Sequence, residues 1–187
     1  MTIDWQFIKE REGKAQTRGY VPDPHGSQSG VTVASGVDLG QQTREQLQAY
    51  ALPHELVTKL TPYIGLRKQE AVRALDEKPL VLTRKEVDAL DRIVHDKHYR
   101  AIADAYSKAA GVPFDSIPDA AQTIICSVAY QYGTALYRRT PNFWRIVVAQ
   151  DWPRAIRALR NFNDRYPTRR NLEADYLEAN LPKVKNV

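Results

Sequence analysis

The stretch from residue 17 to residue 40 is where the helical pattern of this chain is interrupted, and it limits the folds available. On either side, apolar residues recur at helical spacing between charged ones. Within the stretch, TRGYVPD and GVTVASGVDLG contain β-branched residues and turn-forming glycines, with the loop sequence PDPHGS between them. We therefore predict an α+β protein that is predominantly α, with a small irregular β-sheet after its first helix.

Capping residues predict the helix boundaries on both sides of this sheet. Asp4 can cap a short first helix that ends at Gly13. Two capping boxes follow, one at 43–46 and one at 83–86, and the second opens the longest helix, roughly 84–110. Further helices are predicted for 119–132 with a stop at Gly133, for 141–150, and for the residues after an Asp151 cap.

The last helix is predicted to begin after Thr168, which serves as its cap, and to be stopped by Pro182. Leu172, Tyr176 and Leu177 form an apolar stripe along it. We expect this stripe to face the core.

The length of 187 residues fits one domain with a sizeable core, and that domain can be built as two lobes. We predict a single catalytic domain over 1–187, with a small β lobe at about 14–42 and a larger helical lobe formed by the remainder. A ligand is expected in a cleft between the lobes.

Charge, cysteine and histidine content, and apolar run lengths limit which partners, metals and membrane segments the chain can have. The formal net charge of +5 favours an anionic partner, and nucleic acid and the bacterial cell wall are two candidates. Because the basic residues are spread along the chain, they can alternatively form a solvated face. Cys126 is the only cysteine, lies in an apolar run, and is expected to be a small buried residue without a disulfide. Four scattered histidines and one cysteine form no metal-ligand cluster, so we predict no metal site. No cofactor is expected. No apolar run reaches the length of a membrane span, and we predict a monomer.

Three residues around the β-like stretch have the chemistry of a hydrolytic site. Glu12 closes the first helix, where partial desolvation would raise the pKa of a carboxyl and suit it to donate a proton. Asp38 and the hydroxyl of Thr32 can hold a water, and two carboxylates with a water are the parts needed to hydrolyse a glycosidic bond. In the alternative interpretation, Glu12 is an exposed helix residue and Asp38 a turn residue that binds its own backbone.

Five sequence blocks in order point to a known family. The chain resembles the phage-type lysozymes, most closely the pesticin-like muramidases, which are bacterial toxin domains that degrade peptidoglycan. The most specific block has the form T-x-A-x-G-x-D-L-G-Q. The blocks are REG at 11–13, GYVPD at 19–23, SGVTVASGVDLGQ at 29–41, AYQYG at 129–133 and RYPTRRNLEADYL at 165–177.

The resemblance assigns catalytic roles to Glu12, Thr32 and Asp38. Glu12 matches the glutamate at the end of the family's first helix, and Thr32 matches its active-site threonine. Asp38 matches the aspartate that pesticin-like members place six residues beyond that threonine. Phage enzymes keep their aspartate between the glutamate and the threonine, a place that Asp23 can fill here, so Asp23 remains the alternative second carboxylate.

The resemblance also implies supporting residues. Gln131 matches a glutamine that lines the cleft of the phage enzymes, and Arg169 or Arg170 matches a basic position near their glutamate. Gln131 can alternatively bridge helices, and the two arginines can be surface charges.

The implied function is that of an N-acetylmuramidase, a glycoside hydrolase that cuts the β-1,4 bond between N-acetylmuramic acid and N-acetylglucosamine. Glu12 would donate a proton to the leaving oxygen, while Asp38 and Thr32 would align water against the opposite face of the sugar. A separation of about 6.5–9.5 Å between the carboxylates would predict inversion, and about 5–5.5 Å would predict retention.

Two other functions fit the sequence less well. A catalytically silent peptidoglycan-binding module would not require Glu12, Thr32 and Asp38 together. A nucleic-acid-binding helical protein would concentrate basic residues and aromatics on one element, as in YRRTPNFWR and NFNDRYPTRR. Core aromatics on amphipathic helices explain those runs more simply, so we predict no nucleic-acid partner.

Peptidoglycan strands as substrate imply action in the periplasm. The N-terminus, MTIDWQFIKEREGK, lacks the pattern of a secretory signal. Delivery is therefore expected through a secretion system, a larger toxin or a holin. An antibacterial toxin with an immunity protein and a lysis enzyme are both compatible with the sequence.

Overall fold

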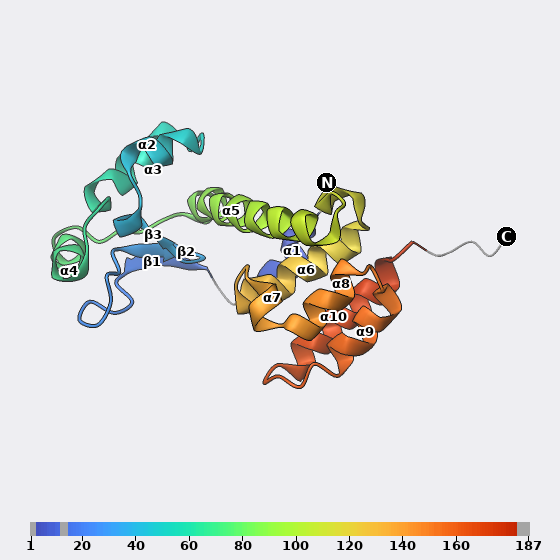
Figure 1. Cartoon of the computed structure of the whole chain (residues 1–187). Helices are drawn as coiled ribbons and strands as arrows, with labels where there is room; N and C mark the ends of the chain where they lie inside the picture. Colours follow the sequence, from blue (N-terminus) through green and yellow to red (C-terminus); the bar gives the residue numbers. More distant parts are fainter. Residues whose placement is uncertain (1–2, 12–14, 183–187) are drawn as a thin grey trace. The chain divides into compact units, whose positions relative to one another are not determined.

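The computed structural model describes residues 3–11 and 15–182, and the chain divides into two compact units (Figure 1). One unit comprises residues 1–12 with 97–187, and the other comprises residues 13–96. The helices of the described residues are α1 Trp5–Lys9, α2 Arg44–Ala49, α3 His54–Leu60, α4 Lys68–Glu77, α5 Arg84–Ala110, α6 Asp119–Tyr132, α7 Leu136–Arg139, α8 Pro141–Val148, α9 Trp152–Arg160 and α10 Pro167–Asn180.

The unit formed by residues 13–96 contains an antiparallel sheet of three short strands in the order β1-β2-β3. The strands are β1 Gln16–Tyr20, β2 Thr32–Ala34 and β3 Val37–Asp38. The register between β1 and β2 shifts along the pair, so the sheet is irregular. The prediction of a small irregular sheet in this part of the chain is confirmed.

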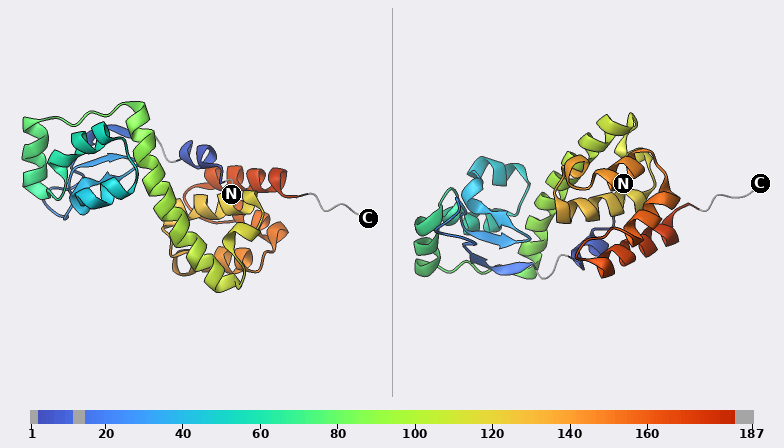
Figure 2. Two further views of the ribbon diagram at one scale, coloured as in Figure 1. Left: turned by 90° about the horizontal axis from the view of Figure 1, so that it is seen from above. Right: turned by 60° about the horizontal axis from the view of Figure 1, so that its bottom comes forward.

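The sheet shares one apolar core with the helices that follow it, which lie around the strands in Figure 2. Val31, Val33 and Val37 are buried together with Leu56 of α3 and Leu90 of α5. A hairpin of such short strands needs other elements to cover its apolar face. For this reason the compact unit continues to residue 96, well past the expected β-lobe boundary near residue 42.

Two glycines allow the loop before β2 and the turn after β3 to touch through their backbones. A Cβ atom added to Gly30 would lie 2.5 Å from the Cα of Gly40 and 2.5 Å from the carbonyl oxygen of Leu66. A Cβ atom added to Gly40 would lie 2.6 Å from the same Leu66 oxygen. A side chain at either position would therefore push backbone segments apart.

The helical unit is built around α6, which is buried from Ala120 to Ala129. Its core includes Phe7 of α1, Leu159 of α9 and Leu177 of α10. Cys126 is fully buried and free, as predicted, and burial raises the pKa of its thiol.

Most of the predicted helix boundaries are confirmed. The longest helix runs from Arg84 to Ala110, and both predicted capping boxes form. Asp4 and Asp151 cap α1 and α9 through their side chains. Helix α6 ends at Tyr132, and its C-cap Gly133 has a φ of 83°, in the left-handed region that favours glycine.

The first helix is shorter than predicted. It ends at Lys9, with Glu10 as its C-cap. Gly13, the predicted stop, lies outside the described residues.

Two details of the predicted last helix are wrong. Helix α10 begins at Pro167 after Tyr166, because proline needs no hydrogen-bond acceptor at the first helical position, so Thr168 is not its cap. Leu172 is 43% exposed, because the buried face of α10 instead carries Arg170, Glu173, Ala174 and Leu177. Of the described helices, none combines the length and the apolar character that crossing a bilayer requires.

The backbone contact at Gly30 predicts a specific instability. Gly30→Ala should lower the free energy of unfolding by about 1–3 kcal/mol, because backbone atoms must move to admit the methyl group. Urea denaturation followed by circular dichroism measures this change. Gly26→Ala is the matched control, since a Cβ there meets only the exposed side chain of Asp23, and it should cost less than about 1 kcal/mol. Equal losses for the two variants would contradict the close-contact interpretation.

Candidate functional site

Thr32 and Asp38 are direct cross-strand partners in the β2–β3 pair. Val33 pairs with Val37 in the same ladder and is buried, so this register is fixed by the apolar face of the hairpin. Thr32 itself is only 5% exposed, and Asp38 is partly exposed. The structure therefore brings these two predicted site residues together.

One carboxylate oxygen of Asp38 accepts hydrogen bonds from the backbone. Asp38 Oδ1 accepts hydrogen bonds from the amides of Gly40 at 2.9 Å and Gly30 at 3.1 Å. The first of these caps the short 3-10 helix Leu39–Gln41. Asp38 Oδ2 accepts no hydrogen bond from any residue that the structure describes, so it is available to a water or a ligand.

The hydroxyl of Thr32 points back along its own strand. Thr32 Oγ1 donates a hydrogen bond of 3.3 Å to the carbonyl of Gly30. That bond directs the lone pairs of the hydroxyl oxygen away from Gly30, so the oxygen can still accept a hydrogen bond from water.

Asp23, the alternative second carboxylate, lies in an exposed turn. Its Oδ1 accepts from the amide of Gly26 at 2.8 Å, and its carbonyl accepts from the hydroxyl of Ser27 at 2.8 Å. This is the local pattern of an aspartate that stabilises a turn. The described hydrogen bonds do not link Asp23 to Thr32 or Asp38.

Glu12, the predicted proton donor, lies outside the described residues. The residue before it, Arg11, belongs to the helical unit. Its guanidinium stacks on the ring of Phe7, 3.4 Å from the centroid, and donates to the carbonyl of Phe7. Burial lowers the pKa of Arg11.

A buried carboxylate organises the helical unit beside Arg11. Glu173 of α10 is 0% exposed. Its Oε1 accepts from the Ser127 hydroxyl at 2.5 Å and from Arg169 Nε at 3.1 Å, and its Oε2 accepts from Arg170 Nη1. Burial raises the pKa of Glu173, while Arg170, Ser127 and Arg169 act in the opposite direction.

Arg170 joins this carboxylate to the residues around it. Its Nε donates to Asp164 at 3.0 Å, and its Nη2 donates to the side chain of Gln131. Asp164 also accepts from the hydroxyl of Tyr132 at 2.7 Å. Burial raises the pKa of Tyr132 to about 12, and the bond to Asp164 adds to this.

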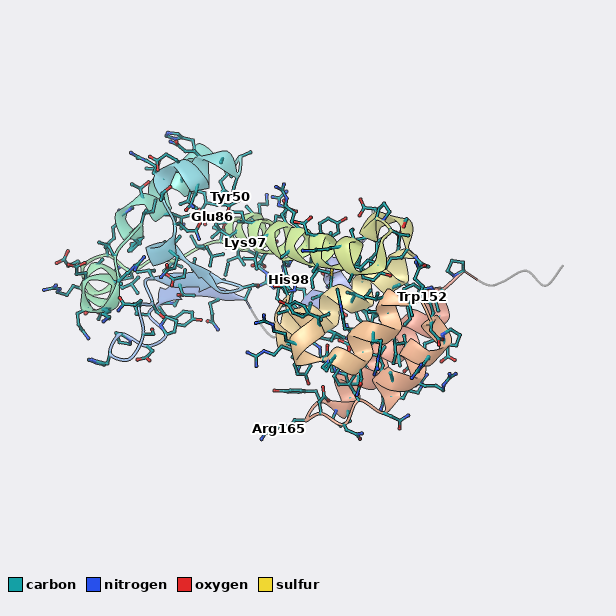
Figure 3. The ribbon with its side chains drawn as sticks, viewed as in Figure 1. Tyr50, Glu86, Lys97, His98, Trp152 and Arg165 are labelled. Carbon is teal, nitrogen blue, oxygen red and sulfur yellow. The ribbon has the colours of Figure 1, made fainter. Side chains whose placement is uncertain are left out.

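Arg169 extends the same network to the end of the first helical segment. Its Nη1 donates to the carbonyl oxygen of Arg11 at 3.4 Å, and its Nη2 donates to the carbonyl of Ser127 at 2.9 Å. The side chain of Arg169 is 12% exposed and that of Arg170 is 1% exposed. Their interpretation as surface charges is therefore wrong. Arg165, by contrast, is exposed on the loop between α9 and α10 (Figure 3).

Gln131, Arg169 and Arg170 thus form one network in the helical unit, while Thr32 and Asp38 form a second group in the sheet-containing unit. Gln131 bridges α6 to α10 through Arg170, which agrees with its alternative interpretation as a helix bridge.

The sequence reasoning missed Glu173 and Ser127. The signal that was available is spacing, since Glu173 stands three and four residues after Arg170 and Arg169 on one helix face. Ser127 is a polar residue inside the apolar run of α6. A polar residue in such a run indicates a buried partner.

A separate pocket of about 400 Å³ lies on the helical unit. Tyr132, Phe162 and Asp164 line it together with three asparagines, Asn142, Asn161 and Asn163. It contains none of the residues that the sequence predicts for catalysis.

Comparison with known protein families shows to which of them this chain belongs. The family described as "Pesticin: Bacterial toxin homologue of phage lysozyme, C-term" matches residues 2–153 of the chain. The chain belongs to this family. No curated protein matches it.

Membership of the pesticin family confirms the predicted phage-lysozyme-like fold. At the level of the family, it supports a lysozyme-type peptidoglycan hydrolase related to bacterial toxins. The match includes Glu12, Thr32 and Asp38, whereas Arg169 and Arg170 lie beyond its end.

The backbone contacts of Asp38 predict a difference between two substitutions. Asp38→Ala should lower the free energy of unfolding by about 1–3 kcal/mol, because the buried amides of Gly30 and Gly40 lose their acceptor. Asp38→Asn keeps an oxygen at the same place and should cost less than about 1 kcal/mol. Urea denaturation of both variants checks this, and equal losses would contradict the assigned hydrogen bonds.

The lowered pKa of Asp164 predicts that the folded state loses stability at acidic pH. Burial alone would raise its pKa, but bonds from Tyr132, the amide of Tyr166 and Arg170 outweigh burial and lower it. A carboxyl with a lowered pKa adds stability above its unfolded pKa of about 3.9, and that contribution is lost as the pH falls through the folded value.

Asp164→Asn should therefore show a smaller difference in unfolding free energy between pH 6 and pH 3 than the wild type. Urea denaturation at both pH values measures the two differences. A variant that loses as much stability on acidification as the wild type would contradict this role of Asp164.

Proposed function

We propose that the protein is an N-acetylmuramidase that hydrolyses the β-1,4 bond between N-acetylmuramic acid and N-acetylglucosamine in peptidoglycan. The observation that carries the proposal is the β2–β3 hairpin, which pairs Thr32 with Asp38 in a chain of the pesticin family. The two compact units would serve one catalytic domain over residues 1–187.

Glu12 is proposed as the general acid. It would be protonated at the start of the reaction and would donate to the oxygen of the leaving sugar as the glycosidic bond breaks. Arg169 reaches the carbonyl of Arg11, the residue before Glu12, so it is proposed to hold this part of the chain in place. A nearby guanidinium lowers the pKa of a carboxyl and favours its ionised form, so the proposed role of Arg169 is to hold this part of the chain and not to keep Glu12 protonated.

Asp38 and Thr32 are proposed to align the attacking water. Asp38 Oδ1 is held by two backbone amides, which fixes the orientation of the carboxylate and leaves Oδ2 for the water. Thr32 Oγ1 would accept the second hydrogen of the same water. A water attacking directly from the face opposite the leaving group would invert the anomeric carbon.

The charge of the protein supports a polyanionic wall as substrate. The formal net charge of +5 would favour residence on peptidoglycan, and added salt would weaken that contribution. We propose action in the periplasm as an antibacterial toxin or a lysis enzyme, with delivery by a secretion system, a larger toxin or a holin. A toxin of this kind would have an immunity protein as its partner.

The test compares hydrolysis of purified peptidoglycan by the wild type, Glu12→Gln and Asp38→Asn. Each charge-removing variant should lose activity by roughly a hundredfold or more, as expected for acid–base groups. Reducing ends are quantified, and mass spectrometry of reduced products shows whether N-acetylmuramic acid carries the new end.

Asp23→Asn is the matched control, because the described hydrogen bond of its carboxylate goes to Gly26 in its own turn. It should keep nearly full activity. An inactive Asp23→Asn together with an active Asp38→Asn would reverse the assignment of the second carboxylate. A wild type that binds the wall without releasing reducing ends would favour the silent binding module.

A further inference from the structure

We propose that Glu173 is a positioning residue for the proposed reaction, because it holds Arg169 against the backbone immediately before Glu12. This inference rests on the proposed function and deepens it. Glu173 was not expected from the sequence, and it lies beyond the end of the family match. Its hydrogen bond to Arg169 connects it to the backbone of Arg11, a connection that filling the core would not require.

The first step is the chain of contacts from Glu173 to Arg11. Glu173 Oε1 accepts from Arg169 Nε at 3.1 Å, and the other end of that guanidinium donates to the Arg11 carbonyl at 3.4 Å. A guanidinium is planar, so fixing its Nε fixes the direction in which Nη1 points. Glu173 thereby sets where Arg169 meets the backbone of residue 11.

The second step is that the position of Glu173 is itself determined by a residue of α6 and by a second residue of its own helix, α10. Ser127 of α6 donates to Oε1, and Arg170 donates to Oε2, so both oxygens are held. Arg170 is in turn bonded to Asp164. An apolar residue at position 173 would fill the space but would remove the acceptor that holds Arg169 Nε.

The third step is electrostatic. The charged groups that act on Glu173 are Arg169 and Arg170 on α10 and Arg11 after α1. Asp164 and Tyr132 are connected to it only through Arg170 among the described contacts. Glu173 offsets part of the positive charge of Arg169 and Arg11. Without it, a carboxylate at Glu12 would be favoured over the carboxylic acid that donates the proton.

The sign of the resulting pH effect follows directly. A general acid is active when protonated, so activity falls as pH rises through its pKa, and this forms the basic limb of the kcat/KM profile. Removing the negative charge of Glu173 should lower the pKa of Glu12. The basic limb should therefore move to lower pH.

The experiment measures pH profiles of kcat and KM on soluble peptidoglycan fragments for the wild type and Glu173→Gln. We expect kcat to fall tenfold or more, KM to change little, and the basic limb to move down by roughly half a pH unit or more. Asp164→Asn is the matched control, since Asp164 binds Arg170 and has no described bond to Arg169, and its limb should move less. A folded Glu173→Gln with wild-type kcat and an unmoved limb would overturn the inference.

A second variant serves if Glu173→Gln does not fold. Ser127→Ala removes a hydroxyl that bonds both Glu173 and Arg169 and leaves every charge in place. It should lower kcat severalfold with KM and the basic limb unchanged, and an unaltered kcat would count against the positioning role. Failure of the proposed function is recognised separately, because then the wild type is inactive or Glu12→Gln stays active.

Discussion

The packing of α10 in the helical unit depends on the hydrogen bonds and ion pairs of the buried Glu173 carboxylate. This carboxylate lies on the buried face of α10 and binds two guanidinium groups and a hydroxyl. Through these partners it ties α10 to α6, to the loop that carries Asp164, and to the carbonyl of Arg11. A buried charge is costly unless it is paired, and removing one partner leaves the others uncompensated. The network therefore holds together as a set.

The sheet-containing unit is organised by a different constraint, namely the approach of two backbone segments. Gly30 and Gly40 meet without side chains between them, and both donate their amides to Asp38 Oδ1. One aspartate thus closes the loop before β2 against the turn after β3. The hydrogen bond from the amide of Ser35 to Asp91 of α5 anchors the opposite end of the hairpin. The same carboxylate that shapes the hairpin is the one proposed to hold water.

The sequence predicted the features that depend on local chemistry. Caps at Asp4 and Asp151, the start of α5 at its capping box and the stop at Gly133 each follow from residues within one helical turn. The sequence predicted one short β-like stretch that contains Thr32 and Asp38, and the structure shows that the two residues pair across β2 and β3. The burial of Arg170 was not predictable in this way, because its partners Gln131 and Asp164 come from other segments. Leu172 was wrongly predicted to face the core for the same reason, because Arg170 and Glu173 lie on the buried face of α10.

The position of α10 has a consequence for how the family match relates to the core of the helical unit. The family match stops at residue 153, whereas the core of the helical unit is completed by Ala174 and Leu177 from beyond that point. A chain trimmed to the matched segment would leave Ser127 and Gln131 facing water and would open the apolar surface of α6. The family match therefore ends at residue 153, whereas the apolar core of the helical unit continues to Leu177. Helices α9 and α10 are as much part of this core as the residues that identify the family.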